Sequence, residues 1–259
     1  MGRIMVLVRA SGLLVAVLLL IWAFGFRASF LPHSNSGDSS DTSQMGHLYS
    51  ALHPLLMVIG FILLSGEAIL AHKWLSAWSR STRKSVHLCL QGAALGFGLF
   101  GIWVKFKGRI GILANFYSLH SWMGLLCLVL FASQWTLGFL RLWHRPENRR
   151  TRTTMLPWHA FVGLYTYGLA VITAETGLLE KLTFLQTRRG VHRRSTESTL
   201  VNALGLGLAF VSALVVFAAV SHKHHRLPYQ SKNVDVNYQS VNKFVQSDGF
   251  VINGKDVSS

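Results

Sequence analysis

Charged residues are scarce in this sequence, and acidic residues are the scarcest. Of its 259 residues 14% are charged, and only ten are Asp or Glu, whereas a soluble domain carries about 25% charged residues. The two cysteines, Cys89 and Cys127, both stand inside apolar segments and offer no disulfide framework. This composition excludes an ordinary soluble domain and a disulfide-stabilised secreted one.

Apolar residues make up 51% of the chain and come in six blocks. Each block reaches the ~20 residues that a helix needs to cross a bilayer at a rise of about 1.5 Å per residue. We therefore predict an all-α fold, an integral membrane bundle of six transmembrane helices. The blocks cover residues 5–25, 47–71, 86–104, 118–140, 155–178 and 200–221.

The blocks divide the chain into four regions. Residues 1–46 hold the first helix and a polar non-cytosolic loop. We expect this helix to be retained, because its apolar run is longer than the h-region of a signal peptide and no convincing cleavage site follows. Residues 47–178 form a four-helix core, 179–222 hold a basic loop and the sixth helix, and 223–259 form a cytosolic tail without predicted order. The segment GLGLAF at 205–210 lies inside the last block, where small residues allow close helix packing, and no site for NADPH or flavin is found.

The net charge of +15 does not indicate a nucleic-acid partner, because the basic residues stand between the apolar blocks. The N-terminus, the second and fourth connections and the tail hold 16 of the 25 Lys and Arg, and the other connections hold nine. The positive-inside rule therefore places both termini of this multi-pass membrane protein in the cytosol.

Four of the twelve histidines share one situation, since each stands in the first turns of a block. His53, His87, His120 and His159 fall one each on the second to fifth helices, which run in alternating directions. His53 and His120 then share an outer layer and His87 and His159 an inner layer, about 20 Å apart. His72, His144, His192 and the tail histidines show no such pattern and are interpreted as polar residues at the interfaces.

Two imidazoles from facing helices can hold a haem iron axially. No CxxCH motif is present, so the sequence predicts two non-covalent haems of b type, one for each pair. Small residues on the same helix faces would leave room for a porphyrin. These are Gly124 and Gly163, four residues after a histidine, and Gly60 and Ala94, seven residues after one.

Other interpretations stay open for the paired histidines. A single membrane histidine is often only hydrogen-bonded to a neighbouring helix. The four together would also suit a haem-free proton or metal transporter, which predicts carboxylates at mid-membrane beside them. A structural or haem-storing membrane protein is the third alternative. With both axial positions filled by protein, however, the pattern favours electron transfer across the bilayer.

Five motifs in the same order resemble the cytochrome b561 family of ascorbate-dependent transmembrane oxidoreductases, and its plant-type stand-alone members most closely. They are LHPLLM (52–57), GEAIL (66–70), SLHSW (118–122), LPWHAFVGL (156–164) and GLLEKLTF (177–184). The resemblance implies a six-helix homodimer with two haems. It implies electron transfer from cytosolic ascorbate to monodehydroascorbate or ferric chelates, in an endomembrane such as the vacuolar membrane or in the plasma membrane. The paired histidines match the family's haem-ligand positions.

Because ascorbate is an anion, cationic residues are expected where each haem meets water. The cytosolic candidates are Lys73, Arg83, Lys84, Arg150 and Arg152, and the non-cytosolic ones are Lys105, Phe106, Lys107 and Tyr117. The alternative is that these charges only flank the membrane helices and set their orientation. The resemblance favours Lys84, Arg150, Arg152, Phe106 and Tyr117 as substrate contacts.

Two carboxylates and one loop add further expectations. Glu67 would carry a proton released by ascorbate oxidation or, alternatively, make a structural hydrogen bond. Glu175 is expected to face water or a basic neighbour. The basic loop at 188–194 departs from the neutral or acidic pattern expected there, and its charge would suit an anionic ferric chelate.

Overall fold

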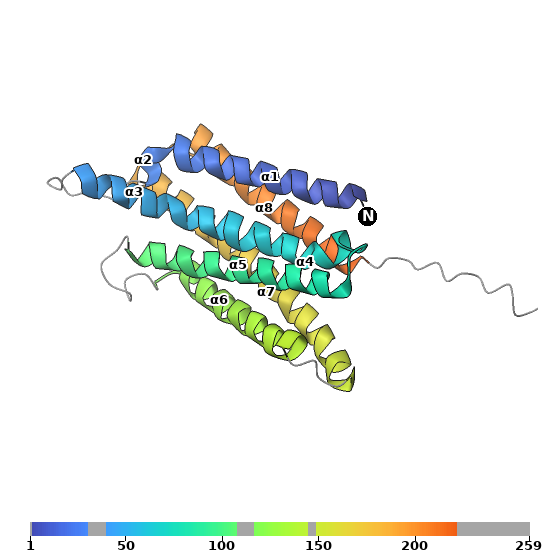
Figure 1. Ribbon diagram of the computed structural model, residues 1–259. Helices are drawn as coiled ribbons and strands as arrows, with labels where there is room; N and C mark the ends of the chain where they lie inside the picture. Colours follow the sequence, from blue (N-terminus) through green and yellow to red (C-terminus); the bar gives the residue numbers. More distant parts are fainter. Residues whose placement is uncertain (1, 31–39, 108–116, 145–148, 222–259) are drawn as a thin grey trace, which may run out of the picture. The chain divides into compact units, whose positions relative to one another are not determined.

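The computed structural model describes residues 2–30, 40–107, 117–144 and 149–221, and this part of the chain contains helices and no strand (Figure 1). In chain order, the elements are α1 (Gly2–Gly25), α2 (Arg27–Phe30), α3 (Ser40–Leu55), η1 (Leu56–Leu63), α4 (Leu64–Trp74), α5 (Arg80–Lys107), α6 (Leu119–Leu137), η3 (Gly138–His144), α7 (Arg149–Arg188) and α8 (Thr196–Val220). The elements η1 and η3 are π-helical segments that continue α3 into α4 and extend α6.

Six helices within the described residues are long and apolar enough to cross a membrane. They coincide with the six predicted blocks, so the prediction of an all-α protein with six spans is confirmed. The fifth span differs in length, because α7 continues to Arg188 instead of ending near residue 178. Leu178, Leu182 and Leu185 are buried at helical spacing along this extension and hold it against the protein. The boundary expected between residues 178 and 179 therefore falls inside a helix.

Neighbouring helices pack as α1 with α8, α4 with α5, and α6 with α7, while α8 also contacts α4 and α7 (Figure 1). Two glycines allow α8 to approach closely on two sides. A Cβ atom at Gly205 would lie 2.8 Å from Oε2 of Glu175 on α7, and one at Gly207 would lie 2.9 Å from Cγ2 of Val15 on α1. The small residues of the segment GLGLAF (205–210) thus serve helix packing, as predicted.

Local sequence signals explain how the helices that carry the histidines begin and bend. The Ser118 hydroxyl accepts a hydrogen bond from the Ser121 amide at 3.3 Å and caps α6, which places His120 in the first turn. Pro54 follows His53 directly, and the helix widens into η1 two residues later, because proline cannot donate the backbone hydrogen bond of a regular turn. The predicted tail at 223–259 and residues 31–39 of the predicted first loop lie outside the described residues.

Candidate functional site

The structure brings the four singled-out histidines together as two pairs. The ring centroids of His53 and His120 are 6.3 Å apart, and those of His87 and His159 are 6.4 Å apart. Within each pair the two rings come from different helices: α3 and α6 in the first pair, and α5 and α7 in the second. These are the pairs that the alternating helix directions predict.

The spacing within each pair fits one metal atom held between two imidazoles. A bond from a first-row metal to an imidazole nitrogen is about 2.0–2.1 Å long, and this nitrogen lies about 1.1 Å from the ring centre. Two imidazoles on opposite sides of one iron would therefore have centroids about 6.3 Å apart. The pairs match this spacing, so the donor set fits axial ligation of a haem iron.

Three of the four imidazoles are also oriented by a hydrogen bond from Nδ1 to a main-chain carbonyl. The acceptors are Gly101 O for His53 at 2.9 Å, Ala68 O for His87 at 2.8 Å, and Thr173 O for His120 at 2.8 Å. A proton held at Nδ1 fixes the tautomer in which Nε2 carries the lone pair. Nε2 is then the atom that can ligate a metal.

The hydrogen bonds also give the separation of the two pairs along the bundle. His87 and Gly101, the partner of His53, stand fourteen residues apart on α5. His159 and Thr173, the partner of His120, stand fourteen residues apart on α7. At 1.5 Å per residue both intervals correspond to about 21 Å, most of the thickness of a hydrocarbon core.

Glycines next to the histidines make room for the rings themselves. A Cβ atom at Gly177 would lie 2.7 Å from Cε1 of His120, and one at Gly138 would lie 3.0 Å from Cε1 of His159. Sequence reasoning missed both glycines, because they stand on the helix that faces the histidine rather than on its own.

The small residues that were singled out in the sequence differ in how much free space surrounds them. Apart from its own turn of α7, no described part of the chain lies within 4 Å of a Cβ position at Gly163, so this face of α7 is open, as a bulky cofactor requires. The Cβ position at Gly124 is 3.6 Å from Thr173 Cγ2. At Gly60 the expected space is occupied, because Phe97 Cγ would be 2.5 Å from a Cβ atom there.

His72, which the sequence placed among polar interface residues, adds a third imidazole to the second pair. Its ring centroid is 5.1 Å from that of His87, with the rings tilted by 34°. His72 is exposed and stands in the last turn of α4. Its position one helical turn after Ala68, which accepts the hydrogen bond of His87, is the sequence signal that would have located it.

The cationic residues at the His87–His159 end have partners within the bundle. Lys84 donates from Nζ to Leu142 O at 2.7 Å and lies 5.5 Å from the Trp143 ring centroid, so it bridges α5 and η3. Lys73 donates to the carbonyl oxygens of Ala218 and Ser221, the latter at 2.7 Å, and thereby caps the C-terminal end of α8.

The other cationic residues at this end are Arg83, Arg150 and Arg152. Arg83 Nε is buried and makes no hydrogen bond within the part of the chain that the structure describes. Arg150 and Arg152 belong to the first turn of α7, but their side chains lie outside the described part.

At the His53–His120 end, Tyr117 is 63% exposed, and its hydroxyl donates to Oε1 of Glu180 at 3.0 Å. Lys105 and Phe106 occupy the last turn of α5, four and five residues after Gly101. The side chain of Lys107 lies outside the described residues. The Tyr117 hydrogen bond thus joins the chain just before α6 to the extended part of α7.

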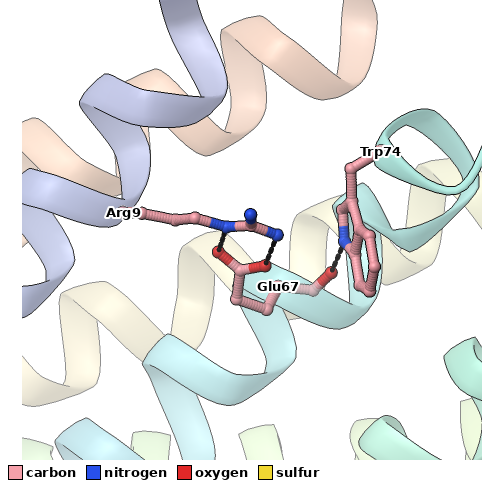
Figure 2. Close-up of polar contacts among 3 residues, drawn as sticks. All are labelled: Arg9, Glu67 and Trp74. Carbon is pink, nitrogen blue, oxygen red and sulfur yellow. Dashed lines mark hydrogen bonds and ion pairs between the residues drawn. The ribbon is translucent and has the colours of Figure 1, made fainter. Parts of the chain in front are cut away.

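Neither of the two singled-out carboxylates has its side chain against a histidine pair within the described residues. Glu67 accepts two hydrogen bonds from Arg9, from Nε at 3.2 Å and from Nη2 at 3.1 Å (Figure 2). Glu175 packs against Gly205 of α8, and its Oε1 is buried without a hydrogen bond among the described residues, instead of facing water or a basic neighbour. The described residues also contain no group of three or more His, Cys, Asp or Glu that could hold a bare metal ion.

Comparison with known proteins gives a consistent result. The family model described as eukaryotic cytochrome b561 matches residues 52–185. The chain is 60% identical to probable transmembrane ascorbate ferrireductase 4 of Arabidopsis thaliana, over 88% of this chain and 87% of that protein. It is 41% identical to transmembrane ascorbate ferrireductase 2 of the same plant (84% and 91%). It is 39% identical to probable ascorbate-specific transmembrane electron transporter 1 of Oryza sativa subsp. japonica (85% and 91%).

Proposed function

The chain belongs to the cytochrome b561 family, and from this premise we propose that it carries electrons across a membrane from ascorbate to an acceptor on the other side. The acceptor class is monodehydroascorbate or a ferric chelate, with ferric chelates favoured by the names of two close relatives. The proposal rests on the two imidazole pairs, His53 with His120 and His87 with His159. Each pair has the spacing of an iron site with two histidine ligands.

The family implies haem b, and the geometry supports two haems per chain. His53 and His120 would hold one, and His87 and His159 the other. A bound haem supplies an iron that exchanges single electrons. With both imidazoles of a pair bound to the iron, no position would remain open for oxygen, which would favour electron transfer. The carbonyls that accept from Nδ1 hold the rings in this orientation.

Positive charge at the His87–His159 end suits an anionic donor. Lys84 stands three residues before His87 and reaches η3, the segment that contains Gly138 beside His159. Arg150 and Arg152 precede His159 on α7. We assign these three residues to the ascorbate site, with Arg83 as a neighbour, whereas Lys73 is engaged in capping α8.

The opposite end would receive the acceptor. Lys105 and Phe106 end α5 near the level of His53, and Tyr117 precedes His120 by three residues. We propose Lys105, Phe106, Lys107 and Tyr117 as acceptor contacts, with both termini of the chain in the cytosol and the acceptor on the non-cytosolic side. A homodimer is the proposed assembly.

The first test is an absorption spectrum with a haem assay on the purified full-length protein, before and after addition of ascorbate. We expect two b-type haems per chain, both reduced by ascorbate. Reconstitution into vesicles loaded with ascorbate should then reduce an impermeant ferric chelate outside. Protein that stays haem-free when haem is supplied during expression would refute the proposal and favour the transporter alternative.

A further inference from the structure

A cavity of about 210 Å³ lies among α1, η1, α4, α7 and α8, and none of the four haem-ligand candidates lines it. Arg9, Glu67 and Tyr167 supply its polar groups. All its other lining residues are apolar or glycine, contributed by α1, η1 and α8. The cavity is therefore separate from the proposed electron-transfer site.

Tyr167 gives the first indication of a ligand. The residue is 2% exposed, and its hydroxyl is buried without a hydrogen bond among the described residues. The hydroxyl lies against α4, since a Cβ atom at Gly66 would be 3.1 Å from it. Burying an unpaired hydroxyl is unfavourable, so this group calls for a partner that occupies the cavity.

The ion pair between Arg9 and Glu67 restricts the charge of a ligand in the cavity. Glu67, next to Gly66, accepts two hydrogen bonds from Arg9, while Trp74 donates from its indole to the Glu67 carbonyl at 3.5 Å (Figure 2). The guanidinium and the carboxylate cancel each other's charge, so an anionic headgroup gains little here. The carboxylate oxygens still have lone pairs that can accept from a neutral hydroxyl group.

The polar groups occupy one end of the cavity. Gly12 stands one turn after Arg9 on α1 and faces Leu63. A Cβ atom at Gly12 would lie 3.8 Å from Leu63 Cδ2, so the lining one turn beyond the contact of Arg9 with Glu67 is apolar. From there the lining is apolar as far as Ala16, seven residues or about 10 Å from Arg9 along α1. Leu13 is 67% exposed, so the cavity reaches the outer surface of a helix that lies in lipid.

We propose that this cavity binds a neutral membrane lipid that carries a hydroxyl on a ring-sized apolar body, a lipid of the sterol class. The ligand hydroxyl accepts from Tyr167 and donates to the Glu67 carboxylate, and the ring that carries it lies along the apolar end. A cavity of about 210 Å³ holds this one ring, because a cavity of about 150 Å³ already binds benzene. The rest of the ligand would remain among the surrounding lipids.

The test uses the full-length haem-loaded protein, a photoreactive sterol and peptide mapping by mass spectrometry. Competitors are an unlabelled sterol, the same sterol with its hydroxyl methylated, and an anionic phospholipid. Tyr167→Phe removes only the hydroxyl, and Tyr165→Phe, on the exposed face of the same helix, is its matched control. Gly12→Leu fills the cavity, and Gly96→Leu, at a position with no neighbour within 4 Å, controls for the added leucine. The haem spectrum reports folding of each variant.

We expect saturable labelling of peptides from α1, α4 or α7, with competition by the free sterol at least fivefold stronger than by its methyl ether. Tyr167→Phe and Gly12→Leu should reduce labelling at least fivefold, and their controls should not. Equal competition by the phospholipid would overturn the proposal in favour of an ordinary lipid groove. Labelling that is absent, or unchanged in Tyr167→Phe, would also overturn it and leave the hydroxyl to a buried water.

Discussion

The ring of His120 occupies the space that a side chain at position 177 would need, since a Cβ atom at Gly177 would lie 2.7 Å from its Cε1. The glycine stands on α7, one turn after Thr173, whose carbonyl accepts from Nδ1 of the same ring at 2.8 Å. Position 177 and the Thr173 carbonyl, both on α7, thus together restrict the position of the ring.

Replacement of Gly177 by Ala should displace His120 and weaken the haem site that we propose for it. No Cβ atom tolerates a contact this short, and the backbone of α7 cannot retreat without losing the Thr173 hydrogen bond. We expect the purified variant to lose about half of its haem by the pyridine haemochromogen assay. Gly168→Ala is the control, because no heavy atom lies within 4 Å of its Cβ position on the same helix. Full haem content in Gly177→Ala would contradict this prediction and show that the His120 ring can move without loss of haem.

Loss of haem ligands should be non-additive within a pair and additive between pairs. His53→Ala, His120→Ala and the double variant should each lose the same single haem, because one haem needs both imidazoles. His53→Ala combined with His87→Ala should lose both haems. Haem content and the spectrum after dithionite reduction measure this directly. Two haems retained in His120→Ala would contradict the ligand assignment.

The sequence predicts the six spans and the two pairs because both depend on periodic, local information. Apolar block length gives the spans, and alternating helix direction then assigns each histidine to a layer. The separation of about 20 Å needs only the rise per residue, and the structure gives about 21 Å by the same relation.

Contacts between helices could not be predicted from the same information. Gly177 and Gly138 stand on the helices that face His120 and His159, and which residues face each other depends on helix rotation. His72 meets His87 because of the packing of α4 against α5. Gly60 was expected to leave space, but Phe97, on the neighbouring helix, fills it.

Substitutions of Lys73 and Lys84 should distinguish a lysine that stabilises the fold from one that binds ascorbate. Lys73→Met removes a cation that caps the end of α8, and we expect a stability loss of about 1 kcal/mol with little change in the KM for ascorbate. Lys84→Met removes the cation nearest in sequence to His87 and should raise the KM about tenfold, the value of one charged hydrogen bond. Thermal unfolding and stopped-flow haem reduction distinguish them. A KM effect of equal size in Lys73→Met would return Lys73 to the ascorbate site.

The ion pair of Arg9 and Glu67 should contribute to the stability of the fold and not to proton transfer. Arg9 is 52% and Glu67 31% exposed, so breaking their bidentate contact by Glu67→Gln should cost only about 0.5–1 kcal/mol. Haem content and the pH profile of ascorbate oxidation should stay as in the parent protein, because the carboxylate is directed at α1 and not at a histidine pair. A double-mutant cycle with Arg9→Met, read by thermal unfolding, isolates the coupling between the two side chains. If Glu67→Gln slowed haem reduction and shifted its pH profile while Arg9→Met did not, the carboxylate would be a proton carrier for the donor reaction.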